Sequence, residues 1–312
     1  LTQHTMCGIS VLMANHWYNI MIRMLKNVSI WIAIDGPRKN NKYDLKENKK
    51  IKKILSENNI RKTNYKFNKA NLGCRKGVNN AISWFFENVN AGIIIEDDVE
   101  ININYAEQMF LWLRHFENES KVCSISSHSS LKADFRLVQE NGICLMPTCR
   151  VWGWATWKNR WIEHMENTNK IKNYSLARIF FLMPNKYRDF HSVLRIWYCL
   201  RNKFDTWDYE WNFFHILNNK YSITPNNFYS INHGFRKDGT HTTNIRNKPK
   251  YKLKKFSIQN KEKLKINNFN SKRLEEIVLS ECGFPLRKNY ILEILRLVKF
   301  LILNLNTKRN LI

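Results

Sequence analysis

The stretch that most constrains the fold is residues 91–100, AGIIIEDDVE, in which a short apolar run ends in three consecutive carboxylates. Residues 93–95 are all isoleucine and do not alternate with polar residues, which is typical of a strand buried on both faces of a parallel sheet. Glu96, Asp97 and Asp98 follow at the carboxyl end of this strand. Because open α/β sheets bind ligands at that end, we expect a ligand site here.

The three acids have two interpretations. Adjacent carboxylates repel one another and favour a hard cation, and Mg²⁺ or Mn²⁺ is usually held by one or two carboxylates together with substrate phosphates. Acidic residues are also favoured in the first turn of a helix, where the helix dipole stabilises negative charge. The sequence favours the metal and phosphate interpretation.

Strand and helix signals alternate along the first 126 residues. Strands are predicted at residues 9–14, 28–34, 65–67, 93–95 and 122–126, and helices at residues 17–26, 44–58, 77–88 and 105–116. Strands that recur at intervals of about 30 residues with helices between them indicate a parallel sheet covered by helices, as in nucleotide-binding folds. The second strand is followed by Asp35, Gly36 and Pro37, a strong turn signal.

Two later segments are rich in aromatic residues. Trp152, Trp154, Trp157 and Trp161 lie within one short segment, and they can serve either as core packing or as a platform on which sugar rings stack. Residues 204–211, FDTWDYEW, place acids between large rings. A carboxylate beside such rings is partly desolvated, which raises its pKa towards the range of a general base.

The acids of that second segment have a structural interpretation as well. Asp205 or Thr206 can be a helix N-cap, with Asp208 completing a pattern like a capping box. Asp205, Asp208 and Glu210 therefore all remain candidates for the base on spacing alone. Further along, residues 231–243, INHGFRKDGTHTT, are typical of a cationic loop that folds over phosphates.

The formal net charge of +25 indicates an anionic partner, which can be nucleic acid, a membrane surface or a phosphorylated substrate. The excess lysines are scattered through residues 39–53 and 248–265, and this dispersal argues against nucleic acid. The seven cysteines show no metal-type spacing, so we expect reduced thiols in a cytoplasmic protein. The N-terminal residues have no charged region before their apolar run, so no signal peptide is expected.

Residues 289–305, NYILEILRLVKFLILNL, are predicted to form a helix with apolar residues nearly all round and a few charges. It can dock on the domain, or lie as a basic amphipathic helix on an anionic membrane face, an interpretation that we slightly favour. No stretch reaches the roughly 18 to 20 apolar residues of a membrane span. We therefore expect a cytoplasmic protein that is peripheral on the inner face of the plasma membrane.

Taken with their order, these motifs resemble those of bacterial glycosyltransferases with the GT-A fold, of the hemolytic-protein-like polysaccharide-biosynthesis group. More distantly, the chain is similar to N-acetylglucosaminyltransferase I type enzymes. Residues 9–243 carry the resemblance, through motifs at residues 35–38, 71–86, 93–98, 151–161, 207–211 and 234–241. The resemblance implies an α/β fold with a GT-A-like (Rossmann-like), mostly parallel central sheet flanked by helices, and a C-terminal helical tail.

The resemblance also implies roles for individual residues. The last acid of the triplet, Asp98, would coordinate a divalent metal, Mn²⁺ or Mg²⁺, with His241 as a neighbour of the metal or phosphate. The Trp-Asp pair selects Asp208 as the catalytic base over Asp205 and Glu210. The residues expected to bind the donor are Asp35, Glu96, Asp97, Trp207, Phe235 and Arg236, and those expected to bind the acceptor are Trp152, Trp154 and Glu210.

The expected activity is that of a metal-dependent inverting glycosyltransferase, either a hexosyl- or an N-acetylhexosaminyltransferase. It would move a sugar from a nucleotide-sugar donor to a surface polysaccharide or lipid-linked glycan, since one carboxylate base and no second carboxylate nucleophile predict inversion. Residues 1–126 would bind the nucleotide sugar, residues 127–244 would bind the acceptor and carry catalysis, and residues 245–312 would be a Lys/Asn-rich linker and an amphipathic helix. The alternatives are a nucleotidyltransferase and a basic module that binds single-stranded nucleic acid.

Overall fold

The computed structural model describes residues 3–8, 28–57, 63–128, 143–225, 227–235, 253–258, 266–267 and 289–309. The strands are β1 Gln3–Gly8, β2 Val28–Ile34, β3 Thr63–Phe67, β4 Ala91–Ile95, β5 Val99–Ile101, β6 Val122–Ser126, β7 Ile143–Met146, β8 Trp154–Trp157, β9 Tyr221–Pro225, β10 Ser230–Asn232 and β11 Ile266–Asn267. The helices are α2 Lys42–Glu57, α3 Gly73–Asn88, α4 Ile103–His115, α5 Lys158–Ile171, α6 Leu176–Leu182, the 3₁₀ turn η2 Asn185–Tyr187, α7 Phe190–Leu200, α8 Asp208–Leu217 and α10 Tyr290–Arg309.

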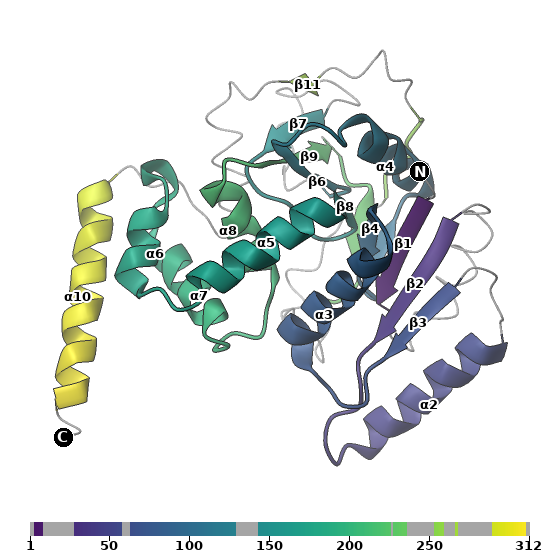
Figure 1. The fold of residues 1–312 in the computed structure, drawn as a ribbon, viewed down its shortest axis with the longest axis horizontal. Helices are drawn as coiled ribbons and strands as arrows, with labels where there is room; N and C mark the ends of the chain where they lie inside the picture. The colour runs from purple at the N-terminus through teal and green to yellow at the C-terminus, as the bar shows by residue number, and fades with distance from the viewer. Residues whose placement is uncertain are drawn as a thin grey trace.

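Nine of the described strands form one sheet in the order β11-β7-β9-β6-β8-β4-β1-β2-β3, and helices lie against it (Figure 1). Strands β1 to β4 are mutually parallel, whereas β8 runs antiparallel to both β4 and β6. Strands β5 and β10 form a separate antiparallel pair. The chain is therefore an α/β protein with a mixed sheet, which confirms the predicted class.

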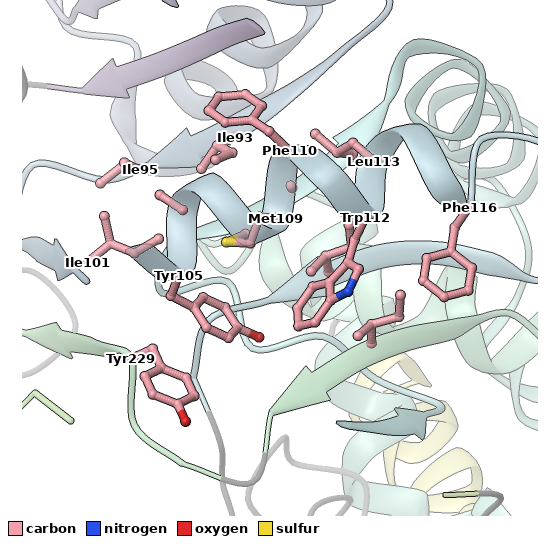
Figure 2. Packing of buried hydrophobic residues seen from close by; sticks show 14 of the residues in the cluster. Ile93, Ile95, Ile101, Tyr105, Met109, Phe110, Trp112, Leu113, Phe116 and Tyr229 are labelled. Atoms are coloured by element: carbon pink, nitrogen blue, oxygen red, sulfur yellow. The ribbon is translucent and has the colours of Figure 1, made fainter. Parts of the chain in front are cut away.

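Strand β4 is buried on both faces, as its unbroken apolar run predicts. Ile93 and Ile95 belong to the core beneath α4, while Ile94 points to the opposite core, where α3 packs. Figure 2 shows Ile93 and Ile95 gathered with side chains of α4, among them Tyr105 and Trp112. Since both faces are filled, the register of β4 is fixed, and the acids that follow it have a defined position.

Residues 253–258, which lie in the segment predicted to be a Lys/Asn-rich linker, contribute to this core. The side chain of Phe256 is buried and packs edge-on against Tyr105 and Tyr229, at 5.0 Å between ring centroids in each case. Strand β11 extends the main sheet by pairing with β7. Lysine and asparagine dominate the composition here, so the sequence carries no sign that Phe256 packs against α4.

Several predicted elements lie where expected, and others differ for identifiable reasons. The strand at residues 28–34 has its predicted bounds, but α3 begins at Gly73, four residues earlier than predicted. The strand and helix predicted at residues 9–26 lie outside the described residues, and the first strand is β1. The helical stretch 174–201 is broken into α6, η2 and α7, since Met183 is extended before Pro184.

Helices α6, α7 and α8 share a further core with α10, which stands at the opposite end of the molecule from α2 (Figure 1). The helix predicted at residues 289–305 is thus present as α10. Within the part of the chain that the structure describes, no helix is long and apolar enough to cross a membrane. All five cysteines whose side chains are described carry free thiols.

The core between α5 and α8 contains two buried histidines. His164 packs against the rings of Trp161, Trp211 and Phe214, and neither of its ring nitrogens has a hydrogen-bond partner among the described residues. Burial lowers the pKa of His164 to about 3 and that of His215 to about 4. Both rings are therefore neutral in the folded protein at every pH near neutrality.

His215 differs from His164 because both of its nitrogens are satisfied. The Trp211 carbonyl, 2.8 Å from Nδ1, can only accept, so Nδ1 carries the proton. Nε2 then accepts from the Ser124 hydroxyl at 3.0 Å. The ring is thereby held in one tautomer, which links α8 to β6.

Acid should destabilise this fold through the two histidines. In the unfolded chain each takes up a proton below about pH 6.5, whereas the folded protein resists protonation, so stability is complete above that pH and falls as pH decreases. At pH 5 the loss should be about 2 kcal/mol for each residue. Urea unfolding at pH 7.5 and pH 5 should show that His164→Phe loses about 2 kcal/mol less stability over this interval than the wild type does.

The exposed His115 supplies the matched control. His115→Gln should leave the pH dependence of unfolding unchanged, because the side chain has no buried environment to lose. An equal loss of stability between pH 7.5 and pH 5 in the wild type and in His164→Phe would contradict the role given to His164.

Candidate active site

The site lies where the strand order reverses direction. From β1 the chain builds β2 and β3 on one side, and it then returns to place β4 on the other side of β1. Asp35 follows the end of β2 and Glu96 follows the end of β4, so both acids lie at the carboxyl edge of the sheet. In open α/β sheets such a switch point is where ligands bind.

Asp35 braces this edge against the start of α3. Its carboxylate accepts from the backbone N–H of Leu72 at 2.9 and 3.0 Å, from that of Gly36 at 2.9 Å and from the amide of Asn68 at 3.1 Å. These donors hold the carboxylate in place. The expected contact with a nucleotide base would have to be made by a side chain that already fixes the turn after β2.

Glu96 is the first acid of the triplet, and its environment strongly disfavours its charged form. Burial, followed by the charges of Asp98, Asp97 and Asp208, raises the pKa of Glu96 to about 8, although the Trp207 indole N–H donates to its Oε1 at 3.3 Å and works in the other direction. Carboxylates from the end of β4 and from the start of α8 are thus close enough to repel one another. The structure brings together two regions that lie far apart in the sequence.

Asp98 lies beside the strand that leads into the predicted cationic loop. Its carbonyl accepts from the backbone N–H of His233 at 2.6 Å, and β10 pairs with β5 directly after the triplet. A Cβ on Gly234 would lie 2.0 Å from Asp98 Oδ2, so only glycine permits this approach. The loop therefore begins against Asp98, while Arg236 and His241 lie outside the described residues.

Asp208 is the first residue of α8, where the helix dipole stabilises a negative charge. The Thr206 hydroxyl donates to Asp208 Oδ1. The charge of Asp208 raises the pKa of Glu96 and that of the Cys74 thiol, which burial raises further. Asp208 therefore lies close enough to Glu96 for its charge to act on that carboxyl, while its role as a base stays a prediction.

The other two acids of the same segment have structural tasks. Asp205 accepts from the backbone N–H of Cys74 at 2.9 Å and from that of Arg75 at 2.8 Å, and so caps α3 from a distant part of the chain. Helix α3 needs this partner, because its own N-cap residue provides no side-chain hydrogen bond. Gly73 allows the contact, since its φ is +78° and a Cβ would lie 2.7 Å from Asp205 Oδ2.

Glu210 is 2% exposed and forms an ion pair with Arg75 at 2.8 Å. Burial raises the pKa of Glu210, and the Arg75 guanidinium partly offsets this effect. A buried, paired carboxylate cannot contact an acceptor sugar, so the expected acceptor role of Glu210 is wrong. No sequence pattern signals this pair, because Arg75 lies on α3 and Glu210 on α8.

The tryptophan-rich segment is mainly core. Trp154 is completely buried, and its ring stacks on Trp207 at 5.5 Å between centroids. A buried ring has no free face for a sugar, so the expected acceptor role of Trp154 is wrong and the packing interpretation holds for it. Trp207 is 2% exposed as well. Its contact with the expected donor site is the hydrogen bond from its indole N–H to Glu96.

Trp152 is the tryptophan of this segment that is only half-buried. Phe235 meets its ring edge-on at 5.8 Å, and the Arg150 guanidinium lies 5.2 Å from the ring centroid. The Trp152 carbonyl accepts from the hydroxyls of Ser127 and Ser230, which fixes its backbone. Trp152, expected to bind the acceptor, and Phe235, expected to bind the donor, thus lie side by side where the predicted cationic loop begins.

The acidic cluster suits a divalent cation by the chemistry of its donors. Glu96, Asp97 and Asp98 offer hard carboxylate oxygens, and their mutual repulsion is relieved by a positive charge. Among the described residues no group of three or more histidine, cysteine or acidic side chains is already arranged as a metal site. His241, the other expected neighbour, lies outside them.

Comparisons with known proteins give no family. Neither the protein-family models nor the curated proteins contain a match to this chain. What the geometry supplies is a cluster of acids at a topological switch point, Asp208 in the first turn of α8 near Glu96, and the aromatic pair Trp152 and Phe235. Such an arrangement can bind a cation with a phosphorylated ligand and can take a proton from a hydroxyl.

Asp205 and Asp208 should respond differently to the same change. Asp205→Ala removes the cap of α3 and should lower the free energy of unfolding by about 1 to 2 kcal/mol. Asp208→Ala relieves repulsion of Glu96 and should change it by less than about 0.5 kcal/mol, or raise it. Urea unfolding followed by tryptophan fluorescence measures both; a destabilised Asp208→Ala beside an unaffected Asp205→Ala would reverse the assignment.

Proposed function

We propose that this chain is a metal-dependent inverting glycosyltransferase with a GT-A-like fold, which transfers a hexosyl or N-acetylhexosaminyl group from a nucleotide-sugar donor to a surface polysaccharide or lipid-linked glycan. The observation that carries the proposal is the meeting of Glu96, Asp97 and Asp98, at the end of β4, with Asp208 at the start of α8. One set of acids suits the donor diphosphate with its cation, and the single acid opposite suits the acceptor hydroxyl.

The topology supports the donor half of this proposal. The strand order β3-β2-β1-β4 is that of a nucleotide-binding α/β sheet, with the acids beside its switch point. The antiparallel strand β8 then joins this half to the rest of the sheet, from which the Trp152 region projects. Of the motifs that resemble the GT-A group, those at residues 35–38 and 93–98 lie at the carboxyl ends of β2 and β4, which supports the proposal.

In this proposal Asp98, with Asp97 beside it, would hold the divalent cation, Mn²⁺ or Mg²⁺. The cation supplies charge stabilisation to the diphosphate leaving group. Glu96 orients towards the ribose or sugar of the donor through its contact with Trp207. The loop that begins at Gly234 lies against Asp98 and would bring its cationic residues over the phosphates.

Asp208 would act as the base. The Thr206 hydroxyl fixes Oδ1, so Oδ2 is the atom that takes the proton from the acceptor hydroxyl. The attacking oxygen then approaches the anomeric carbon from the side opposite the diphosphate, which inverts its configuration. Asp205 and Glu210 are poor alternatives, because one caps α3 and the other is buried in an ion pair.

Turnover with a panel of nucleotide sugars, read as the mass of the product, tests the proposal. Asp208→Asn should lower kcat by about a hundredfold or more while donor affinity is retained, because only the base is lost. Asp98→Asn should weaken donor binding in the presence of Mn²⁺, since the cation site is lost. The exposed Glu87, on the far end of α3, gives the matched control Glu87→Gln, which should behave as the wild type.

Three results would contradict the proposal. Near-normal turnover of Asp208→Asn would remove the base assignment. Transfer that survives both chelation and Asp98→Asn would remove the metal. A nucleotide added from a nucleoside triphosphate, with no sugar transferred from any donor, would identify a nucleotidyltransferase instead.

A further inference from the structure

Helix α10 has one face that belongs to the domain core. Leu297 is 2% exposed, and Ile294, Phe300 and Leu301 pack around it against the cluster built by α6, α7 and α8. Glu293 is buried as well and accepts from the backbone N–H of Phe190 at 2.9 Å. One face of α10 is thus packed against the core formed by α6, α7 and α8.

The opposite face of α10 is apolar and exposed. Six aliphatic side chains, each between 42% and 69% exposed, lie on it: Ile291, Leu292, Leu295, Val298, Ile302 and Leu303. Their spacing of three and four residues places them in one stripe along the helix. A single exposed leucine needs no explanation, but a stripe of this length marks an interaction surface.

The same surface continues onto the end of α6. Phe181 and Leu182 are 53% and 40% exposed there. The Arg188 guanidinium joins the two helices, because it lies 5.5 Å from the Phe181 ring centroid and 5.2 Å from that of Tyr290, at the start of α10. We define the α6–α10 face as the six aliphatic residues of α10 together with Tyr290, Phe181 and Leu182.

Within the described residues of α6, α7 and α10, the acids are buried and the exposed charged side chains are positive. Glu293 is the sole acid in the sequence of α10, and it is 1% exposed and paired with Arg296. Asp189 is the sole acid between α6 and the end of α7; it is 1% exposed and caps α7 through the Ser192 N–H. Arg178, Lys186 and Lys299 are exposed.

We propose that the α6–α10 face docks on an anionic membrane surface. An exposed aliphatic and aromatic stripe flanked by cations, with the acids turned into the core, combines the two signals that interfacial binding needs, apolar insertion and attraction to acidic headgroups. A second copy of this chain is a poorer occupant, because it would bring another cationic face of a protein with net charge +25 against the first. The proposal is independent of the glycosyltransferase assignment.

Vesicle binding by the full chain tests it. The probe is sedimentation with vesicles of equal parts phosphatidylglycerol and phosphatidylcholine, compared with vesicles of phosphatidylcholine alone. The triple variant Ile291→Ser, Leu295→Ser and Ile302→Ser should lower the partition coefficient by about tenfold or more, since it removes apolar side chains from the interface. Its substitutions leave Leu297 and the core face of α10 intact, so folding should be preserved.

A matched apolar control uses Tyr43→Ser, Leu45→Ser and Ile162→Ser, three exposed apolar residues on α2 and α5. This variant should bind the anionic vesicles as the wild type does. For charge, Arg178→Glu with Lys299→Glu should weaken binding, whereas Lys46→Glu with Lys49→Glu on α2, an equal change in net charge, should weaken it much less. Near-ultraviolet circular dichroism should show all four variants to be folded.

Four outcomes would overturn the proposal. The first two are that the wild type does not bind anionic vesicles at low salt, or that it binds the phosphatidylcholine vesicles equally well. The α10 triple variant could bind as tightly as the wild type. Light scattering could show a dimer that the triple variant splits without any change in vesicle binding, and the face would then be an interface between copies of the chain.

Discussion

The candidate site depends on how Trp207 packs at the end of β4. Its ring stacks on Trp154, inside the aromatic core shared by α3, α5 and α8, and its indole N–H reaches Glu96. This contact fixes the start of α8 against the carboxyl edge of the sheet, so that Asp208 faces the acidic triplet. Asp205 also connects the segment before α8 to α3, because its carboxylate caps the start of α3.

The packing of α8 against the end of β4 brings several carboxylates close together, which is electrostatically unfavourable. Burial, and then repulsion by the neighbouring carboxylates, raise the pKa of Glu96 to about 8. Stable folding then requires strong packing beneath the site, and the buried tryptophans supply it. A site with this much negative charge favours a cation, which in turn can bind a phosphorylated ligand, and Gly234 approaches Asp98 closely beside it.

Much of this was predictable from the sequence, and what was not has physical reasons. The run Ile93 to Asp98 predicts a buried strand, which the structure confirms, and an acidic ligand site, which stays a prediction. Both signals are local in the sequence. The choice among Asp205, Asp208 and Glu210 could not be made locally, since the α3 cap and the Arg75 ion pair join residues far apart in the chain. Trp154 misleads for a related reason: composition shows abundance of aromatic rings, while burial, which depends on the whole fold, decides whether a ring can bind a sugar.

Whether the acids after β4 bind a cation together with a nucleoside diphosphate is measured most directly by electron paramagnetic resonance of Mn²⁺. Free Mn²⁺ is titrated with the protein, with and without a panel of nucleoside diphosphates. The wild type should take up Mn²⁺ more tightly with one of the diphosphates than without it, and Asp98→Asn should lose that uptake while remaining folded. Equal uptake by Asp98→Asn, or no uptake that depends on a nucleoside diphosphate, would contradict the account.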